Sequence, residues 1–319
     1  MDDTAGFDFF LLIDFTCLIL TGIVLYDLLK HKFSKLVSFA GVVVYYSLEF
    51  GPRYQLSNFW LSDSLAYLFV ILCFWSIQRK EYQMYSIFLT VGILAKEVVL
   101  FTIPVFLIAY YKDDDEQDFL KIVFHILPAI TVFLGIRLFV PVDDSVPYDM
   151  IAIITNLIVI RISHWSSELY RYTITTWGLF LMILPIFNKK QEVKEWVTQY
   201  GLFLVLVYFQ LLLAENTERL LVLGFVPIIV LSLSGFQSIS NKQSTIEKSY
   251  LLITVLYFVY RLITNAPFDS TDPFVNHVIF CVPTFFALFV IQRFLRKRQG
   301  DAIPSVVDSE SNYEKRTLY

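Results

Sequence analysis

A lysine and a glutamate, Lys96 and Glu97, stand next to each other between two apolar stretches that hold no other charge. An ionisable residue in such a stretch is costly to bury and usually serves a function. The lysine ammonium can bind a phosphate as a point charge, and the glutamate can take up or release a proton. The alternative is a self-neutralising pair that caps the turn between two helices.

Two further charged residues stand at the start of apolar stretches. Asp63 opens the span in WLSDSLAYLF, where it is either an acid of a functional site or a carboxylate that the helix dipole favours. Arg219 follows two acids in AENTERLLVLGFVP. It either pairs with Glu215 or Glu218, or meets an anionic headgroup with the planar, bidentate geometry of a guanidinium.

A third candidate set follows a helical spacing. Arg161, His164, Glu168 and Arg171 are separated by 3, 4 and 3 residues, which places them on one face of a helix. Two arginines beside a histidine and a glutamate can cradle a phosphate, with Glu168 or His164 as acid–base candidates. An amphipathic helix that lies on lipid headgroups carries the same stripe.

The sequence offers little support for a metal or another cofactor. Asp143 and Asp144 form a paired acid that could hold a divalent cation, but two carboxylates in a loop are usually solvated. The three cysteines, Cys17, Cys73 and Cys281, lie in apolar stretches without the spacing of metal ligands, which argues against a zinc site or a disulfide framework. We therefore expect no bound metal and no cofactor.

The elements that position these residues must be membrane helices. The chain has 319 residues, of which 56% are hydrophobic and 17% are charged, whereas soluble domains carry roughly 25% charged residues. The mean hydropathy is +0.61. A span needs about 20 apolar residues. The expected spans are Phe9–Leu29, Leu36–Phe50, Leu61–Ile77, Met84–Tyr111, Phe119–Val140, Thr173–Phe187, Val197–Leu213, Leu220–Phe236, Ser249–Thr264 and Phe274–Ile291.

The charges of the connectors predict the orientation of the chain. The basic connectors are Lys30–Lys35, Gln78–Lys80, Asn188–Lys194, Asn241–Lys248 and Gln292–Arg298. The other loops are Gly51–Phe59, Pro141–Asp149, Ala214–Glu218 and Asn265–Pro273. The positive-inside rule places the first set in the cytoplasm and the second set outside.

This pattern holds only if the stretch 84–111 turns back on itself. We expect two short helices, Met84–Ala95 and Val98–Tyr111, that meet at Lys96 and Glu97 on the outer face. One more crossing at Met150–Tyr172 would place the basic connectors that follow on the outer side. We therefore expect that this segment does not cross the membrane and forms an interfacial helix on the outer face.

The predicted fold class is all-α. It is a polytopic transmembrane helix bundle of about 11 passes in the plasma membrane, with the N-terminus outside and the C-terminus in the cytoplasm. Residues 1–298 form one transmembrane domain, and residues 299–319 form a polar cytoplasmic tail that we expect to be disordered. Membrane lipids are the expected partners, and no nucleic acid is expected.

The residues around Asp63 and Lys96 carry a family resemblance. WLSDSLAYLFVILCFW and GILAKEVVLFTIP resemble the motifs "D-x-L-a-x-L-f" and "G-x-L-x-(K/R)-E", which a proline-bearing apolar run follows, in GT-C-type glycosyltransferases. ERLLVLGFVPIIVLS is similar to the "R-x-L-x-x-x-x-P" segment of the same polytopic enzymes. The similarity covers roughly Leu61 to Gly235.

The resemblance implies that a sugar moves from a polyprenyl-phosphate donor to an acceptor glycan, lipid or protein on the outer face. The donor phosphate would meet Lys96, Arg219 and either Arg161 or Arg171. Asp63 would deprotonate the acceptor hydroxyl, with Glu97 or Glu218 in reserve. Stabilisation of the departing phosphate would supply most of the rate enhancement.

One departure from the family keeps two alternatives open. The family's catalytic acid lies in a first outer loop after a helix that runs outward, whereas this chain is expected to begin outside, at Met1–Phe7, without that helix. The first alternative is a non-catalytic membrane subunit or a degenerate transferase in envelope polysaccharide assembly. A transporter or flippase for a lipid-linked substrate is the other alternative, although only Asp14 and His125 lie well inside spans.

Overall fold

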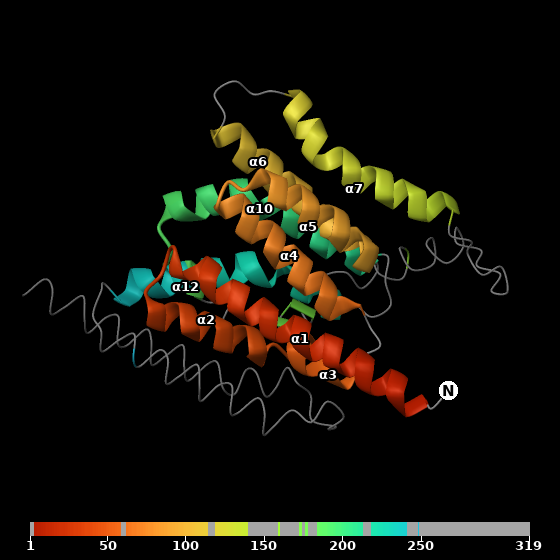
Figure 1. Ribbon diagram of the computed structural model, residues 1–319. Coiled ribbons are helices and arrows are strands. Elements are labelled where there is room, and N and C mark those ends of the chain that lie inside the picture. Colours follow the sequence, from red (N-terminus) through yellow and green to blue (C-terminus); the bar gives the residue numbers. More distant parts are fainter. Residues whose placement is uncertain are drawn as a thin grey trace, which may run out of the picture.

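The structure is a computed structural model, and every element in its described part is a helix (Figure 1). It describes residues 3–58, 62–113, 119–139, 159, 172–173, 176–177, 184–212, 218–240 and 248. The predicted all-α class is confirmed for these residues. The expected interfacial helix at 150–172, apart from single residues, the spans at 249–264 and 274–291, and the tail at 299–319 lie outside them.

The elements follow one another along the chain as α-helices joined by short π- or 3₁₀-helical segments, which carry the label η. They are α1 (Asp3–Lys30), α2 (Lys35–Ser47), η1 (Glu49–Arg53), α3 (Tyr54–Ser57), α4 (Asp63–Gln78), α5 (Tyr82–Ala95), η2 (Glu97–Thr102), α6 (Ile103–Asp113), α7 (Phe119–Phe139), η3 (Leu184–Phe187), α10 (Lys190–Phe209), η4 (Gln210–Leu212), α11 (Glu218–Leu221), η5 (Val222–Gly224) and α12 (Phe225–Ser240).

Length and hydropathy indicate a membrane protein. Within the described residues, three helices are long and apolar enough to cross a membrane, namely Asp8–Lys30, Phe119–Phe139 and Arg219–Ser238. Large apolar side chains on α1 and α7 lie on the outside of the bundle, among them Phe9 at 60% and Phe124 at 72% exposure. Exposed apolar surface on this scale marks contact with lipid or a partner. The count of about 11 passes stays a prediction.

Helices α1 and α4 run parallel to each other, and contacts at both of their ends show it. Asp14 of α1 lies beside Ser64 at the start of α4. Asp27, near the end of α1, accepts hydrogen bonds from Trp75 Nε1 at 2.8 Å and from Arg79 Nη2 at 2.6 Å. The start of α1 therefore lies at the same end of the bundle as the start of α4.

The break that was expected near Lys96 is present. Lys96 has extended backbone angles (φ −165°, ψ 134°) and separates α5 from η2. The ring of Tyr82 lies 5.1 Å from that of Tyr110, and the ring of Tyr85 stacks on Phe106 at 4.4 Å. These pairs are symmetric about Lys96. Helices α5 and α6 therefore form an antiparallel hairpin with Lys96 at its tip.

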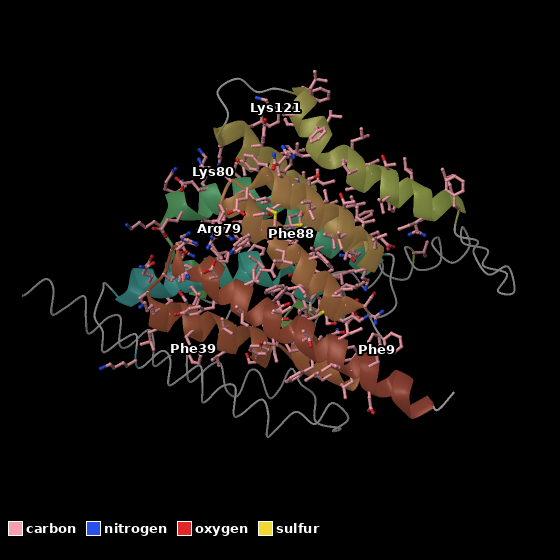
Figure 2. All side chains as sticks on the ribbon, in the orientation of Figure 1. Phe9, Phe39, Arg79, Lys80, Phe88 and Lys121 are labelled. Carbon is pink, nitrogen blue, oxygen red and sulfur yellow. The ribbon has the colours of Figure 1, made fainter. Side chains whose placement is uncertain are left out.

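The basic connectors gather at one end of the bundle, which we call the basic end. Lys32, Lys80, Lys112 and Glu192, from four different parts of the chain, line one cavity there. Figure 2 shows Lys80 on the left of the bundle and Phe9, near the start of α1, on the right. We call the opposite end, where α4 begins, the Asp63 end.

Two local expectations need correction or refinement. The segment Asn188–Lys194 was interpreted as a connector, but α10 already begins at Lys190; Lys, Gln and Glu are good helix formers, so the helix extends through it. Pro104 and Pro227 lie within the expected spans Met84–Tyr111 and Leu220–Phe236, and the structure shows where in their helices they fall. They are the second residue of α6 and the third of α12, each just after a 3₁₀ segment, where the missing N–H costs least.

Candidate functional site: an acid between two cations

Asp63 lies between two cations that come from distant parts of the chain. Its Oδ1 accepts a hydrogen bond from Lys96 Nζ, and its Oδ2 lies 3.5 Å from Arg219 Nη1. The side chain of Asp63 is 4% exposed. A carboxylate removed from water to this extent is costly unless opposite charges contact it. The cluster holds two positive charges and one negative charge, which leaves one net positive charge.

Each member of the cluster is positioned by a separate element. Asp63 is in the first turn of α4, where the helix dipole favours a carboxylate. Lys96 occupies the tip of the α5–α6 hairpin. Arg219 is the second residue of α11, and its backbone carbonyl accepts a hydrogen bond from the Tyr67 hydroxyl at 3.0 Å. Tyr67 lies one helical turn after Asp63, so α4 contacts both the side chain and the backbone of Arg219.

The cations are more accessible than the acid between them. The side chains of Lys96 and Arg219 are 21% and 20% exposed, so an anion that approaches this end meets them before it meets Asp63. The Nε of Arg219 has no hydrogen-bond partner among the described residues. A point charge and a planar guanidinium at one place suit the oxygens of a phosphate.

The self-neutralising pair that was considered for Lys96 and Glu97 is wrong. Glu97 Oε1 instead lies 3.0 Å from Arg137 Nη2 of α7, with both side chains more than half exposed. The backbone of Lys96 is extended, and consecutive side chains of an extended backbone point to opposite sides. Lys96 therefore reaches α4, and Glu97 reaches α7.

A second buried acid lies close to the cluster. Asp14 is 2% exposed, and neither of its carboxylate oxygens has a hydrogen-bond partner among the described residues. Ser64 and Asp63 are its polar neighbours on α4. The sequence shows that Asp14 lies inside an apolar stretch. It does not show that Asp14 is close to Asp63, because that proximity depends on the packing of α1 against α4.

The other predicted site residues are not placed by the structure. Arg161, His164, Glu168 and Arg171 lie outside the described residues. Glu218 begins α11, but only its backbone is described. In the described part of the chain, no group of three or more His, Cys, Asp or Glu side chains is arranged to hold a metal ion.

No protein-family model, no curated protein and no solved structure matches this chain, so the function has to be inferred from the site itself.

Proposed function

We propose that this membrane protein binds a phosphate-bearing lipid at the Asp63–Lys96–Arg219 cluster. It transfers the sugar of a polyprenyl-phosphate donor to an acceptor on the outer face of the plasma membrane, as in the GT-C-type glycosyltransferases that its sequence resembles. One observation carries the proposal. Two cations from distant segments meet over one buried carboxylate, at the end of the bundle opposite to the basic connectors.

The position of the cluster supports a site on the outer face. The positive-inside rule assigns the basic end to the cytoplasm, and the cluster then faces outward. A lipid phosphate at this depth contacts Lys96 and Arg219 at the surface of the bundle. As the bond to the sugar breaks, negative charge grows on the phosphate, and cations held in place by Asp63 stabilise that charge without reorganisation.

The geometry suggests separate roles for the two candidate acids. Asp63 is covered and is held by both cations, so we assign it the positioning of Lys96 and Arg219. The carboxylate of Glu97 is 56% exposed and lies at the same end of the bundle as the cluster, so an acceptor hydroxyl can reach it from solvent. Glu97 is therefore the better candidate for the base that takes the proton of the acceptor hydroxyl.

A second candidate function is a non-catalytic lipid-binding subunit, and the ion pair between Glu97 and Arg137 favours it. Glu97 is bound to Arg137, and a carboxylate held by an arginine must release it before it can accept a proton. If the pair does not open, the site binds a lipid phosphate and performs no transfer.

Binding is tested first, by thermal unfolding of the purified full chain in nanodiscs with increasing undecaprenyl phosphate. A ligand present at 100 times its dissociation constant stabilises the native state by about 2.7 kcal/mol. We expect a saturable rise in Tm for the wild type, and its loss in Arg219→Gln and in the double variant Asp63→Asn/Lys96→Gln, which removes the carboxylate of residue 63 together with its lysine partner.

Arg137→Gln is the matched control, because Arg137 lies at the same end of the bundle and loses the same charge. It should retain the rise in Tm. A well-folded wild type without any rise would overturn the lipid-phosphate site. If binding is present, transfer of a labelled sugar from the polyprenyl-phosphate donor that is lost in Glu97→Gln identifies an enzyme. Binding without transfer identifies the non-catalytic subunit.

A further inference from the structure

A cavity of about 390 Å³ lies at the basic end of the bundle. Its lining comes from α1, α4, α6, α10 and α12 and from the connectors that follow α1 and α4. The apolar part of the wall includes Leu29, Phe74, Val105 and Val226. The volume is within the range of roughly 300–1,000 Å³ that is usual for small-ligand sites.

Lysines from three separate segments line this cavity. Lys32 follows α1, Lys80 follows α4, and Lys112 is in the last turn of α6. Lys32 and Lys112 have no ion-pair partner among the described residues. All three lysines are exposed, so an anion can reach their ammonium groups from solvent.

The acidic side of the cavity carries less charge than the basic side. Glu192 and Glu195, both on α10, are the acids in the lining. Glu195 already accepts a hydrogen bond from Gln191 at 2.8 Å. The three lysines exceed the two glutamates by one positive charge, so the cavity favours an anion.

An aromatic wall indicates the depth of the cavity in the membrane. Trp196 and Tyr200 line it, and their rings lie 6.1 Å apart. Trp196 Nε1 donates a hydrogen bond to the carbonyl of Pro227 at 2.9 Å, and the ring of Tyr200 lies 5.8 Å from that of Phe74. Trp and Tyr are enriched at the level of the lipid headgroups. An aromatic wall of this kind suits a cavity at the level where headgroup and acyl chain meet.

We propose that this cavity binds an anionic phospholipid of the leaflet at the basic end. The phosphate lies between Lys32 and Lys112, and the first methylenes of an acyl chain lie against the apolar wall. Basic pockets between membrane helices on the cytoplasmic side are suited to anionic headgroups. The lining has a basic part and an apolar part, and a lipid contacts both. A small soluble anion would contact the lysines but leave the apolar wall unfilled.

This site is independent of the Asp63 cluster. Helix α4 has 16 residues and separates the two ends by roughly 24 Å at 1.5 Å per residue. A lipid at the basic end does not touch Lys96 or Arg219, so either proposal can fail without the other.

The test measures binding of dioctanoyl phosphatidylglycerol to the detergent-purified full chain by thermal unfolding. The comparison ligands are dioctanoyl phosphatidylcholine and inorganic phosphate. We expect a saturable rise in Tm with phosphatidylglycerol, and at least a tenfold loss of affinity in Lys32→Gln/Lys112→Gln. The control Lys189→Gln/Lys190→Gln removes the same charge from exposed residues at this end that do not line the cavity, and it should bind like the wild type.

A second variant tests the cavity without changing the charge. Ala109→Phe places a ring into the apolar lining and should weaken phosphatidylglycerol binding while every lysine stays in place. Equal binding in wild type, lysine variant and Ala109→Phe would overturn the proposal. It would also be overturned if inorganic phosphate or phosphatidylcholine reproduced the full effect of phosphatidylglycerol.

Discussion

At the scale of single residues, two neighbouring buried acids differ in what surrounds them. Asp63 contacts Lys96 and Arg219, and these charges offset the cost of removing its carboxylate from water. Asp14 is equally buried but has no hydrogen-bond partner among the described residues. A buried polar group without a partner lowers stability by about 1–3 kcal/mol. The first acid organises the cluster, whereas the second has Ser64 as a polar neighbour outside hydrogen-bond geometry, and we expect it to lower the stability of the fold.

The substitution Asp14→Val should therefore raise the free energy of unfolding by about 1 kcal/mol. Valine has a similar size and needs no hydrogen-bond partner. Denaturation with SDS in mixed micelles measures the change. Thr16→Val is the control in the same helix, because the exposed Thr16 hydroxyl bonds to the carbonyl of Leu12 at 2.7 Å and its removal should change stability little. A lower stability of Asp14→Val would show that its carboxyl has a partner in the folded protein.

At the scale of elements, the α5–α6 hairpin brings Lys96 to Asp63 because α5 approaches its neighbours closely. Gly92 lies one turn before Lys96, and a Cβ there would come within 2.8 Å of Phe69 Cβ on α4 and 2.9 Å of Val99 Cγ1 in η2. A real Cβ does not approach other atoms so closely in a packed interior. The missing side chain of Gly92 thus sets the distance between α5 and α4, and with it the position of Lys96.

Two glycine substitutions should have opposite effects on stability. Alanine is favoured over glycine in a helix by about 1 kcal/mol, but Gly92→Ala must move α4 or η2 and should lower stability. A Cβ at Gly135 on α7 would have no other atom within 4 Å. Gly135→Ala should therefore raise stability by up to about 1 kcal/mol. Thermal unfolding of both variants checks the signs. A stabilised Gly92→Ala would contradict the close approach.

Gly92→Ala should also weaken lipid-phosphate binding, because it displaces the hairpin tip that carries Lys96. Gly135→Ala should leave that binding unchanged.

At the scale of the whole molecule, charge is divided between the two ends of the bundle. Lysines of three segments lie at the basic end, whereas the Asp63 cluster and the Glu97–Arg137 pair lie at the other. In Figure 2, the labelled basic residues Arg79, Lys80 and Lys121 lie toward the other end of the helices from Phe9. This division predicts that the basic end faces the cytoplasm.

Labelling of single cysteines in whole cells tests this orientation. Cys17 and Cys73 are buried, so a Cys281→Ser background suits the experiment. We expect Arg137→Cys to react with a membrane-impermeant maleimide in intact cells, and Lys189→Cys to react only after permeabilisation. The reverse pattern would place the Asp63 cluster in the cytoplasm and exclude an outer-face transfer.

Several features of this protein could be predicted from the sequence because they depend on local properties. Hydropathy over about 20 residues predicts apolar helices, and a charged pair in the middle of the stretch 84–111 predicts the break at Lys96. The ends of helices were less predictable, as α10 shows by starting inside a connector. There, polar residues with good helix propensity extend the helix beyond its apolar part.

Only the tertiary structure decided which charges meet. Adjacency in the chain suggested Glu97 as the partner of Lys96, whereas the hairpin assigns Lys96 to Asp63 and Glu97 to Arg137. The proximity of Asp14 to Asp63 and the cavity at the basic end likewise arise from helices that are distant in sequence. The sequence by itself determined which segments are helical and where charge is placed along them, because both follow from neighbouring residues. Ion pairs and cavities depend on how helices pack, and packing joins residues that no local pattern connects.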